Sequence, residues 1–158
     1  MKTRLIASVV LGAAVVLSTS GCAMLASQST TIPYSPADGM SVPNSSGPLE
    51  VRNALIVADE DGSAGNLVAA IVNTSDDAEV LNIEVGEGDD ATSLTVRVPG
   101  GAVKSLGDGD TEPLLIEDLN TIPGATVSVY FQSGDGEGAR AEIPVLNGDL
   151  DYLTPLVP

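Results

Sequence analysis

The chain has 158 residues, with 22 acidic and six basic side chains, one cysteine, and no histidine or tryptophan. This length allows one domain of ordinary size with appendages. The composition excludes an imidazole general base, Ser–His–Asp and Cys–His catalytic groups, histidine metal ligands and an internal disulfide.

The N-terminal segment has the order of a bacterial export signal. Lys2 and Arg4 precede an apolar run over residues 5–17, which is too short to span a bilayer comfortably. The sequence Leu17-Ser18-Thr19-Ser20-Gly21-Cys22 follows and resembles the lipobox of bacterial lipoproteins, with threonine where leucine is usual. The resemblance implies a signal peptide over residues 1–21, cleavage between Gly21 and Cys22, and a diacylglycerol anchor with palmitate-type acyl chains on Cys22. The alternative is a plain secretory signal with a chance cysteine.

Two acyl chains suffice for stable anchoring, so we expect the protein on the extracytoplasmic face of the cell membrane, bound to it through the lipid. Loss of Lys2 and Arg4 with the signal leaves 22 acids against four bases, a balance of −18. This charge repels anionic lipid headgroups and nucleic-acid phosphates. We therefore expect no nucleic-acid binding.

The segment after the anchor is predicted to be a disordered tether. Residues 22–47 begin with the lipidated Cys22 and continue with many serines, threonines and prolines and little periodicity. The sequence thus predicts four parts: the signal peptide, this tether, a folded domain over residues 48–147, and a C-terminal tail over residues 148–158.

From residue 49 onward the hydrophobic period is two, and Gly, Pro, Asn and Asp separate the periodic segments. In the first segment Leu49, Val51, Leu55 and Val57 alternate, which predicts one shared buried face. We predict strands over residues 49–57, 67–72, 80–85, 94–98, 127–132 and 141–145, with shorter candidates at 102–106 and 114–116. Seven or eight short strands indicate an all-β fold, an antiparallel β-sandwich of Ig-like or cupredoxin-like topology, preceded by a signal helix and a flexible linker.

Residues 112–119, 122–131 and 141–145, with Val72-Asn73-Thr74-Ser75, resemble the strand and turn order of PCuAC-type periplasmic copper chaperones. Over residues 49–146 the chain is more similar to small actinobacterial cell-envelope lipoproteins of the LpqE type. The resemblance implies the sandwich fold. Copper chaperones of the PCuAC type bind the metal through His and Met, whereas this chain has Glu112-Pro113-Leu114 at that position and no histidine. We therefore expect neither the copper site nor another cofactor.

Two acidic turns place oxygen ligands at alternate positions, as calcium loops do. They contain the metal-ligand candidates Asp59 and Asp61, and Asp108 and Asp110. Neither turn has the glycine and glutamate that an EF-hand requires at its sixth and twelfth positions. Solvated acidic turns are the simpler interpretation.

Two further segments have a structural interpretation. The glycine-rich string over residues 134–138 contains two acids and leads into a predicted strand, so we interpret it as a hairpin and not as a phosphate loop. The C-terminal tail contains Leu150, Leu153, Leu156 and Val157. We expect it to pack on the domain; the alternative is an exposed recognition motif.

The leading hypothesis is a lipid-anchored, non-catalytic binding or assembly module of the cell envelope, with an envelope protein or the cell wall as partner. The first alternative is an extracytoplasmic protein that binds divalent cations such as Ca²⁺ through its acidic turns. The second is a hydrolase that uses carboxylates, or Lys104 as part of a nucleophilic pair, in a deep pocket.

Overall fold

A computed structural model describes residues 37–88 and 91–158. The predicted signal peptide with Gly21, the anchor residue Cys22 and tether residues 23–36 lie outside the described residues. The described chain forms the following elements: η2 (Asn44–Ser46), β1 (Leu49–Ala58), β2 (Gly65–Asn73), β3 (Glu79–Val85), β4 (Thr92–Val98), β5 (Val103–Leu106), β6 (Leu114–Ile116), β7 (Thr126–Ser133), β8 (Ala139–Leu146) and η4 (Thr154–Leu156). All eight predicted strands are confirmed. Within this part of the chain, no helix has the length and hydropathy that crossing a membrane requires.

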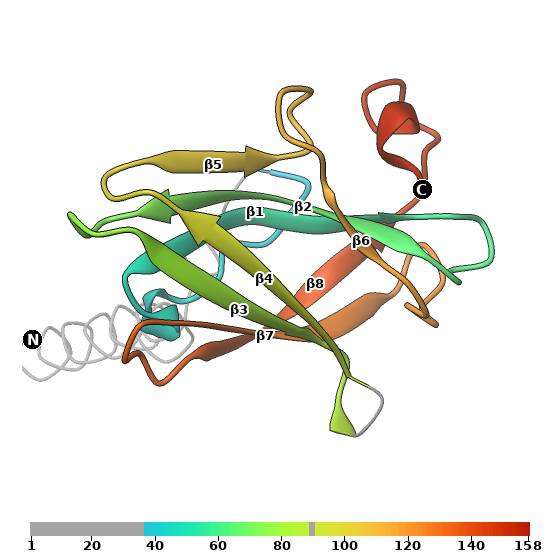
Figure 1. The fold of residues 1–158 in the computed structure, drawn as a ribbon. Coiled ribbons are helices and arrows are strands. Elements are labelled where there is room, and N and C mark those ends of the chain that lie inside the picture. The colour runs from blue at the N-terminus through green and yellow to red at the C-terminus, as the bar shows by residue number, and fades with distance from the viewer. Residues whose placement is uncertain (1–36, 89–90) are drawn as a thin grey trace, which may run out of the picture. The chain divides into compact units, whose positions relative to one another are not determined.

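The strands form two layers joined along one side. Their order is β4-β3-β7-β8-β1-β2-β5, and β6 also pairs with β2. Figure 1 shows β5, β2 and β1 in one layer and β4, β3, β7 and β8 in the other. The layers meet where β1 and β8 pair in parallel, at Ile56 with Val145 and Val57 with Leu146, and the other pairs are antiparallel. The predicted all-β sandwich is confirmed.

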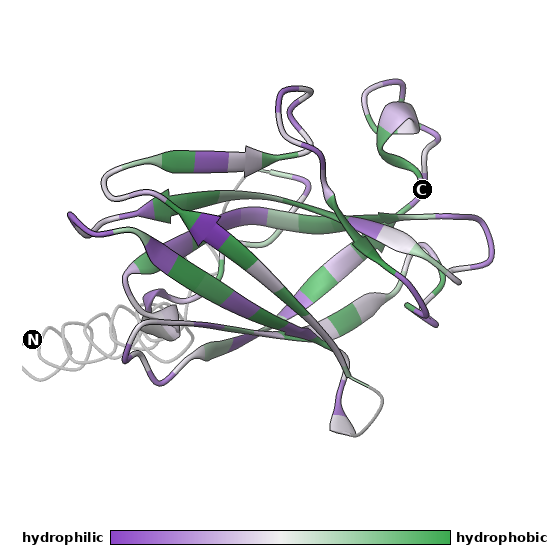
Figure 2. Cartoon of the chain, in the orientation of Figure 1, coloured by the Kyte–Doolittle hydropathy of each residue, from purple (hydrophilic) through white to green (hydrophobic). Residues whose placement is uncertain are grey.

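The core lies between the layers and is almost wholly aliphatic. Strands β2 and β3 alternate buried with more exposed residues, and Figure 2 shows this alternation as green and purple bands along β3. Phe131, the chain's one phenylalanine, is fully buried among the aliphatic side chains. Each large side chain buried in this way contributes about 1.5–3 kcal/mol, so burial can stabilise a domain without a disulfide.

Strand β1 contains a bulge that changes which side chains face the core. Its register against β2 shifts between Arg52 and Leu55, and Asn53 has a φ of 50°. The bulge inserts one residue into the alternation, so the side chains after it face the opposite way. Leu49 and Val51 therefore belong to the main core, whereas Leu55 and Val57 form a second cluster on the outer face. The predicted shared face of these four residues is wrong for this reason.

An N-terminal arm, residues 37–47, lies against β1, although the sequence assigned it to the tether. The bulge frees the N–H and C=O of Ala54 from the β2 ladder, and both bond Met40 at 2.8 Å. The N–H of Gly39 donates to Oδ1 of Asn53 at 2.8 Å, and Val42 is only 2% exposed. Residues 37–47 thus belong to the folded part, and the predicted boundary at residue 48 is too late.

The C-terminal tail covers the outer face of β1. Leu153 is 3% exposed and packs against Leu55 and Val57, with Leu156 and Val157 beside them. Nδ2 of Asn66 on β2 donates to the carbonyl of Leu156 at 2.9 Å. The expectation that the tail packs on the domain is confirmed, and the outward side chains created by the bulge explain what it packs against.

Candidate functional site

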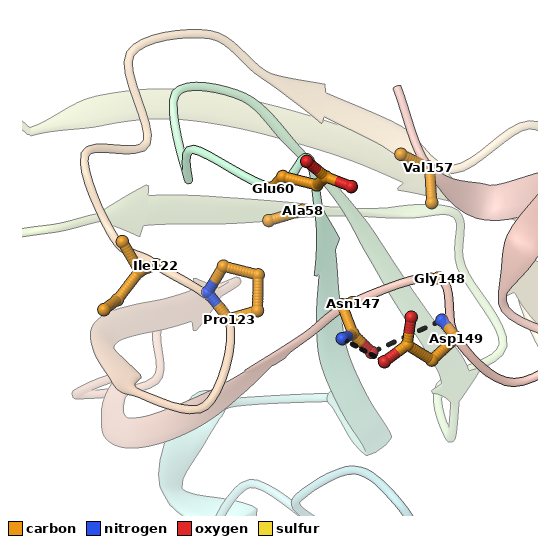
Figure 3. Close-up of a pocket in the computed structure, with 8 residues that line it drawn as sticks. All are labelled: Ala58, Glu60, Ile122, Pro123, Asn147, Gly148, Asp149 and Val157. Carbon is orange, nitrogen blue, oxygen red and sulfur yellow. Dashed lines mark hydrogen bonds between the residues drawn. The ribbon is translucent and has the colours of Figure 1, made fainter.

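A cavity of about 610 Å³ opens at the end of the sandwich where β1 and β8 finish. Figure 3 shows its lining residues, which come from four segments: Ala58, Glu60, Ile122, Pro123, Asn147, Gly148, Asp149 and Val157. The volume lies within the range of about 300–1,000 Å³ typical of ligand pockets. We call this feature the loop-end cavity.

The first wall is the β1–β2 turn, which Asp59 holds in shape. Its carboxylate accepts hydrogen bonds from the backbone N–H groups of Ser63 at 2.8 Å and Ala64 at 3.2 Å, and from the Ser63 hydroxyl at 2.5 Å. The hydroxyl bond is the main reason that the pKa of Asp59 lies below its ordinary value of 3.8. Glu60, the next residue, is thereby placed at the cavity.

The second wall is the β6–β7 loop, which is tied to the first. The N–H groups of Leu119 and Thr121 donate to the carbonyls of Ser63 at 2.9 Å and Gly62 at 3.0 Å. Leu119 inserts into the core and is only 6% exposed. Farther along, the N–H of Gly124 donates to the carbonyl of Val145 at 2.8 Å. Ile122 and Pro123 of this loop are therefore held on both sides.

The third wall follows β8 and includes the end of the tail. Nδ2 of Asn147 donates to Oδ2 of Asp149 at 2.7 Å, and the N–H of Asp149 donates back to Oδ1 of Asn147 at 3.3 Å (Figure 3). The Thr154 hydroxyl donates to the carbonyl of Gly148 at 2.8 Å. A β-carbon on Gly148 would lie 2.5 Å from Cγ2 of Val157, so a side chain at this position would have to displace Val157. The Asp149 carboxylate is therefore oriented before any ligand arrives.

The cavity combines apolar surface with negative charge. Ile122 is 64% exposed on its wall, beside Pro123 and Val157. Glu60 and Asp149 are exposed and come from different loops. Within the described ranges neither carboxylate has a cationic side chain within 4.0 Å. The lining therefore offers both apolar contacts and carboxylates to a ligand.

The predicted metal-ligand candidates lie on two different turns. Asp59 and Asp61 are in the β1–β2 turn, whereas Asp108 and Asp110 are in the turn after β5. Oδ1 of Asp108 accepts hydrogen bonds from the N–H groups of Asp110 at 3.1 Å and Thr111 at 2.9 Å. Over residues 37–88 and 91–158, no three acidic or cysteine side chains are grouped so that they would hold a metal ion. Asp59 and Asp108 stabilise their own turns.

The structure places Lys104 away from the loop-end cavity. It is half-buried on β5 and lines an open hollow of about 430 Å³ between β4 and β5, together with Arg97, Asp110 and Glu112. The string over residues 134–138 connects β7 to β8, which confirms the predicted hairpin.

Sequence reasoning did not predict the loop-end cavity. In the sequence, Glu60 is one acid in an acidic turn, and Ile122 is the first residue of the segment 122–131. The Asn-Gly-Asp order of residues 147–149 is a turn signal, but many turns have it. The cavity depends on four segments that are distant in the sequence. Comparison with known proteins finds no family and no curated protein that matches this chain.

Proposed function

We propose that the protein is a membrane-anchored extracytoplasmic lipoprotein whose sandwich is a non-catalytic binding module of the cell envelope, with the loop-end cavity as its binding site. The observation that carries the proposal is this cavity, in which hydrogen bonds hold the walls and Ile122 exposes 64% of its surface. Apolar surface on held walls supports binding, because little further ordering is needed when a partner arrives.

The anchoring half of the proposal rests on the sequence. The basic residues, the apolar run and Ser20-Gly21-Cys22 support lipidation at Cys22. Because the arm occupies residues 37–47, at most residues 23–36 are left for the proposed tether, and a flexible chain of that length has a root-mean-square span of about 20 Å. The likeness to LpqE-type envelope lipoproteins belongs to the same proposal, and so does a partner in the envelope.

Anchoring is tested on the full chain expressed in a bacterium that processes lipoproteins. Mass spectrometry of the wild-type protein should find an N-terminus at Cys22 that carries diacylglycerol, in the membrane fraction. Cys22→Ala should lose the lipid and either leave the membrane or accumulate as the uncleaved precursor. An unmodified, full-length wild-type chain in the cytosol contradicts the proposal.

Binding at the cavity is tested by cross-linking in intact envelopes with a matched pair of variants. Ile122→Ser removes the exposed isoleucine of the cavity, and Val103→Ser removes a side chain of similar exposure, 60%, on β5. A cross-linked partner should be kept by the wild type and Val103→Ser and lost by Ile122→Ser. If both variants keep it, or both lose it, the cavity is not the binding site.

A further inference from the structure

We propose that the loop-end cavity binds a basic polypeptide segment, in which a lysine or arginine side chain lies next to an aliphatic residue. This inference rests on the proposed binding function and adds the chemistry of the partner. It starts from the two kinds of surface that the cavity presents. Ala58, Ile122, Pro123 and Val157 are apolar, whereas Glu60 and Asp149 are the carboxylates that line it.

The apolar wall of the cavity predicts the aliphatic part of the partner. Exposure of 64% is unusual for an isoleucine when the same domain buries Ile56, Ile71, Ile83, Ile116 and Ile143 almost completely. The hydrogen bonds of Thr121 to Gly62 and of Gly124 to Val145 hold the backbone on both sides of Ile122, and its side chain lines the cavity. A partner that covers it gains the free energy of apolar burial, about 25 cal/mol per Å².

The two carboxylates of the cavity predict the cationic part of the partner. Among the described residues, Arg52 and Arg140 take Glu50 and Glu87 as partners at 2.8 and 3.4 Å, but no cation reaches Glu60 or Asp149. In the part of the chain that the structure describes, no cationic side chain lines the cavity. Asp149 is held by its bonds with Asn147, so a cationic group finds a carboxylate that needs no reorientation.

The charge of the whole chain favours the same class of partner. After removal of the signal, 22 acids stand against four bases. Such a field accelerates association with cationic partners and repels acidic ones, and salt screens both effects. A lysine or arginine side chain also has an aliphatic stem, which can lie on Ile122 and Pro123 while its charged end reaches a carboxylate.

The test measures fluorescence anisotropy of labelled synthetic peptides titrated with the full-length protein in a neutral detergent. Three blocked peptides share one aliphatic sequence and differ at one central position, which is lysine, leucine or glutamate. The lysine peptide should bind more tightly than the leucine peptide and the glutamate peptide least. The advantage of the lysine peptide should shrink as salt rises from about 0.05 to 0.5 M.

Two double variants with the same change of net charge locate the effect. The double variant Glu60→Gln with Asp149→Asn removes both cavity charges and keeps a hydrogen-bond acceptor for Asn147. It should lower the affinity for the lysine peptide about fivefold to tenfold. Glu84→Gln with Asp135→Asn changes exposed acids on β3 and on the β7–β8 hairpin, and it should change binding less than about twofold.

The outcomes separate this inference from the proposed function. If the lysine and leucine peptides bind equally well and Ile122→Ser abolishes the binding of both, the inference of a basic partner is wrong but the cavity is still the binding site. Equal weakening by the two double variants overturns it as well, because the attraction is then a property of the whole surface. Binding of none of the peptides overturns the inference, while the cross-linking experiment still decides whether the cavity binds a partner.

Discussion

The two ends of the sandwich have comparable hydrogen bonds between their segments but differ in the space that remains between those segments. At the end where β1 begins, the Ser133 hydroxyl donates to the carbonyl of Ser46 at 3.0 Å and accepts from the N–H of Leu49 at 3.1 Å. Both serines are fully buried. At the end where β1 finishes, three loops are tied to each other or to the strands by comparable bonds, yet about 610 Å³ remains between them.

This difference shows that hydrogen bonds between loops can either pack the loops tightly together or hold the walls of an open cavity in place. We call the end where β1 begins the closed end. There the hydrogen bonds of Ser133 bring backbone segments into contact, so a β-carbon on Gly47 would lie 2.1 Å from the carbonyl oxygen of Ser133. At the loop end the β1–β2 turn and the β6–β7 loop also touch, since a β-carbon on Gly62 would lie 2.3 Å from the carbonyl oxygen of Thr121, but the cavity remains beside this contact. A β-carbon on Gly124 would find nothing within 4 Å, although the φ of this residue, 92°, is close to the 109° of Gly47. Substitutions at matched positions therefore test the comparison.

The largest effect is expected from alanine at these two glycines. Gly47→Ala combines a positive φ with a backbone clash and should lower the free energy of unfolding by about 3 kcal/mol or more. Gly124→Ala adds only the cost of a positive φ in a residue with a β-carbon, and it should lower the free energy of unfolding by about 1 kcal/mol. Urea unfolding of the two variants measures both values. Equal losses would show that the closed end is not closely packed.

A smaller loss is expected where the tail packs on β1. Leu153→Ala removes the most buried side chain of the tail and should cost about 2–3 kcal/mol, because the cluster with Leu55 and Val57 is small and peripheral. Leu150→Ala, at a leucine that is 50% exposed, is the matched control and should change stability by less than about 0.5 kcal/mol. Hydrogen exchange should show the tail opening in Leu153→Ala. If the two variants are equal, the tail does not contribute to stability through Leu153.

The smallest effect concerns the turn that carries Glu60. The folded-state pKa of Asp59 is lowered, so its carboxylate adds stability above the ordinary value of 3.8, and this is lost as the pH falls through the folded pKa. Asp59→Asn should therefore flatten the decline of stability between about pH 5 and 2. Asp61→Asn removes the same charge from the same turn and is the matched control for the change of net charge. Parallel acid curves for Asp59→Asn and the wild type would contradict the role of Asp59.

The strands could be predicted from the sequence because the patterns that indicate a strand or a turn lie within a few neighbouring residues. Alternating apolar residues around Ile83, Phe131 and Ile143 predict strands without knowledge of their partners, and turn residues separate them. The same reasoning failed at Asn53, where one residue in a bulge reversed the sides of Leu55 and Val57. A bulge depends on which strand pairs where, and nothing in the spacing of residues 49–58 marks it.

Composition, charge and the eight strands follow from residues close together in the chain, and the sequence alone determines them. The packing of the arm and tail and the loop-end cavity were decided only by tertiary structure. Met40 meets Ala54 because a bulge frees two backbone groups, and Leu153 meets Leu55 because the same bulge turns that side chain outward. Glu60, Ile122 and Asp149 become neighbours only when β1, β7 and β8 have paired, since long-range pairing alone joins their loops.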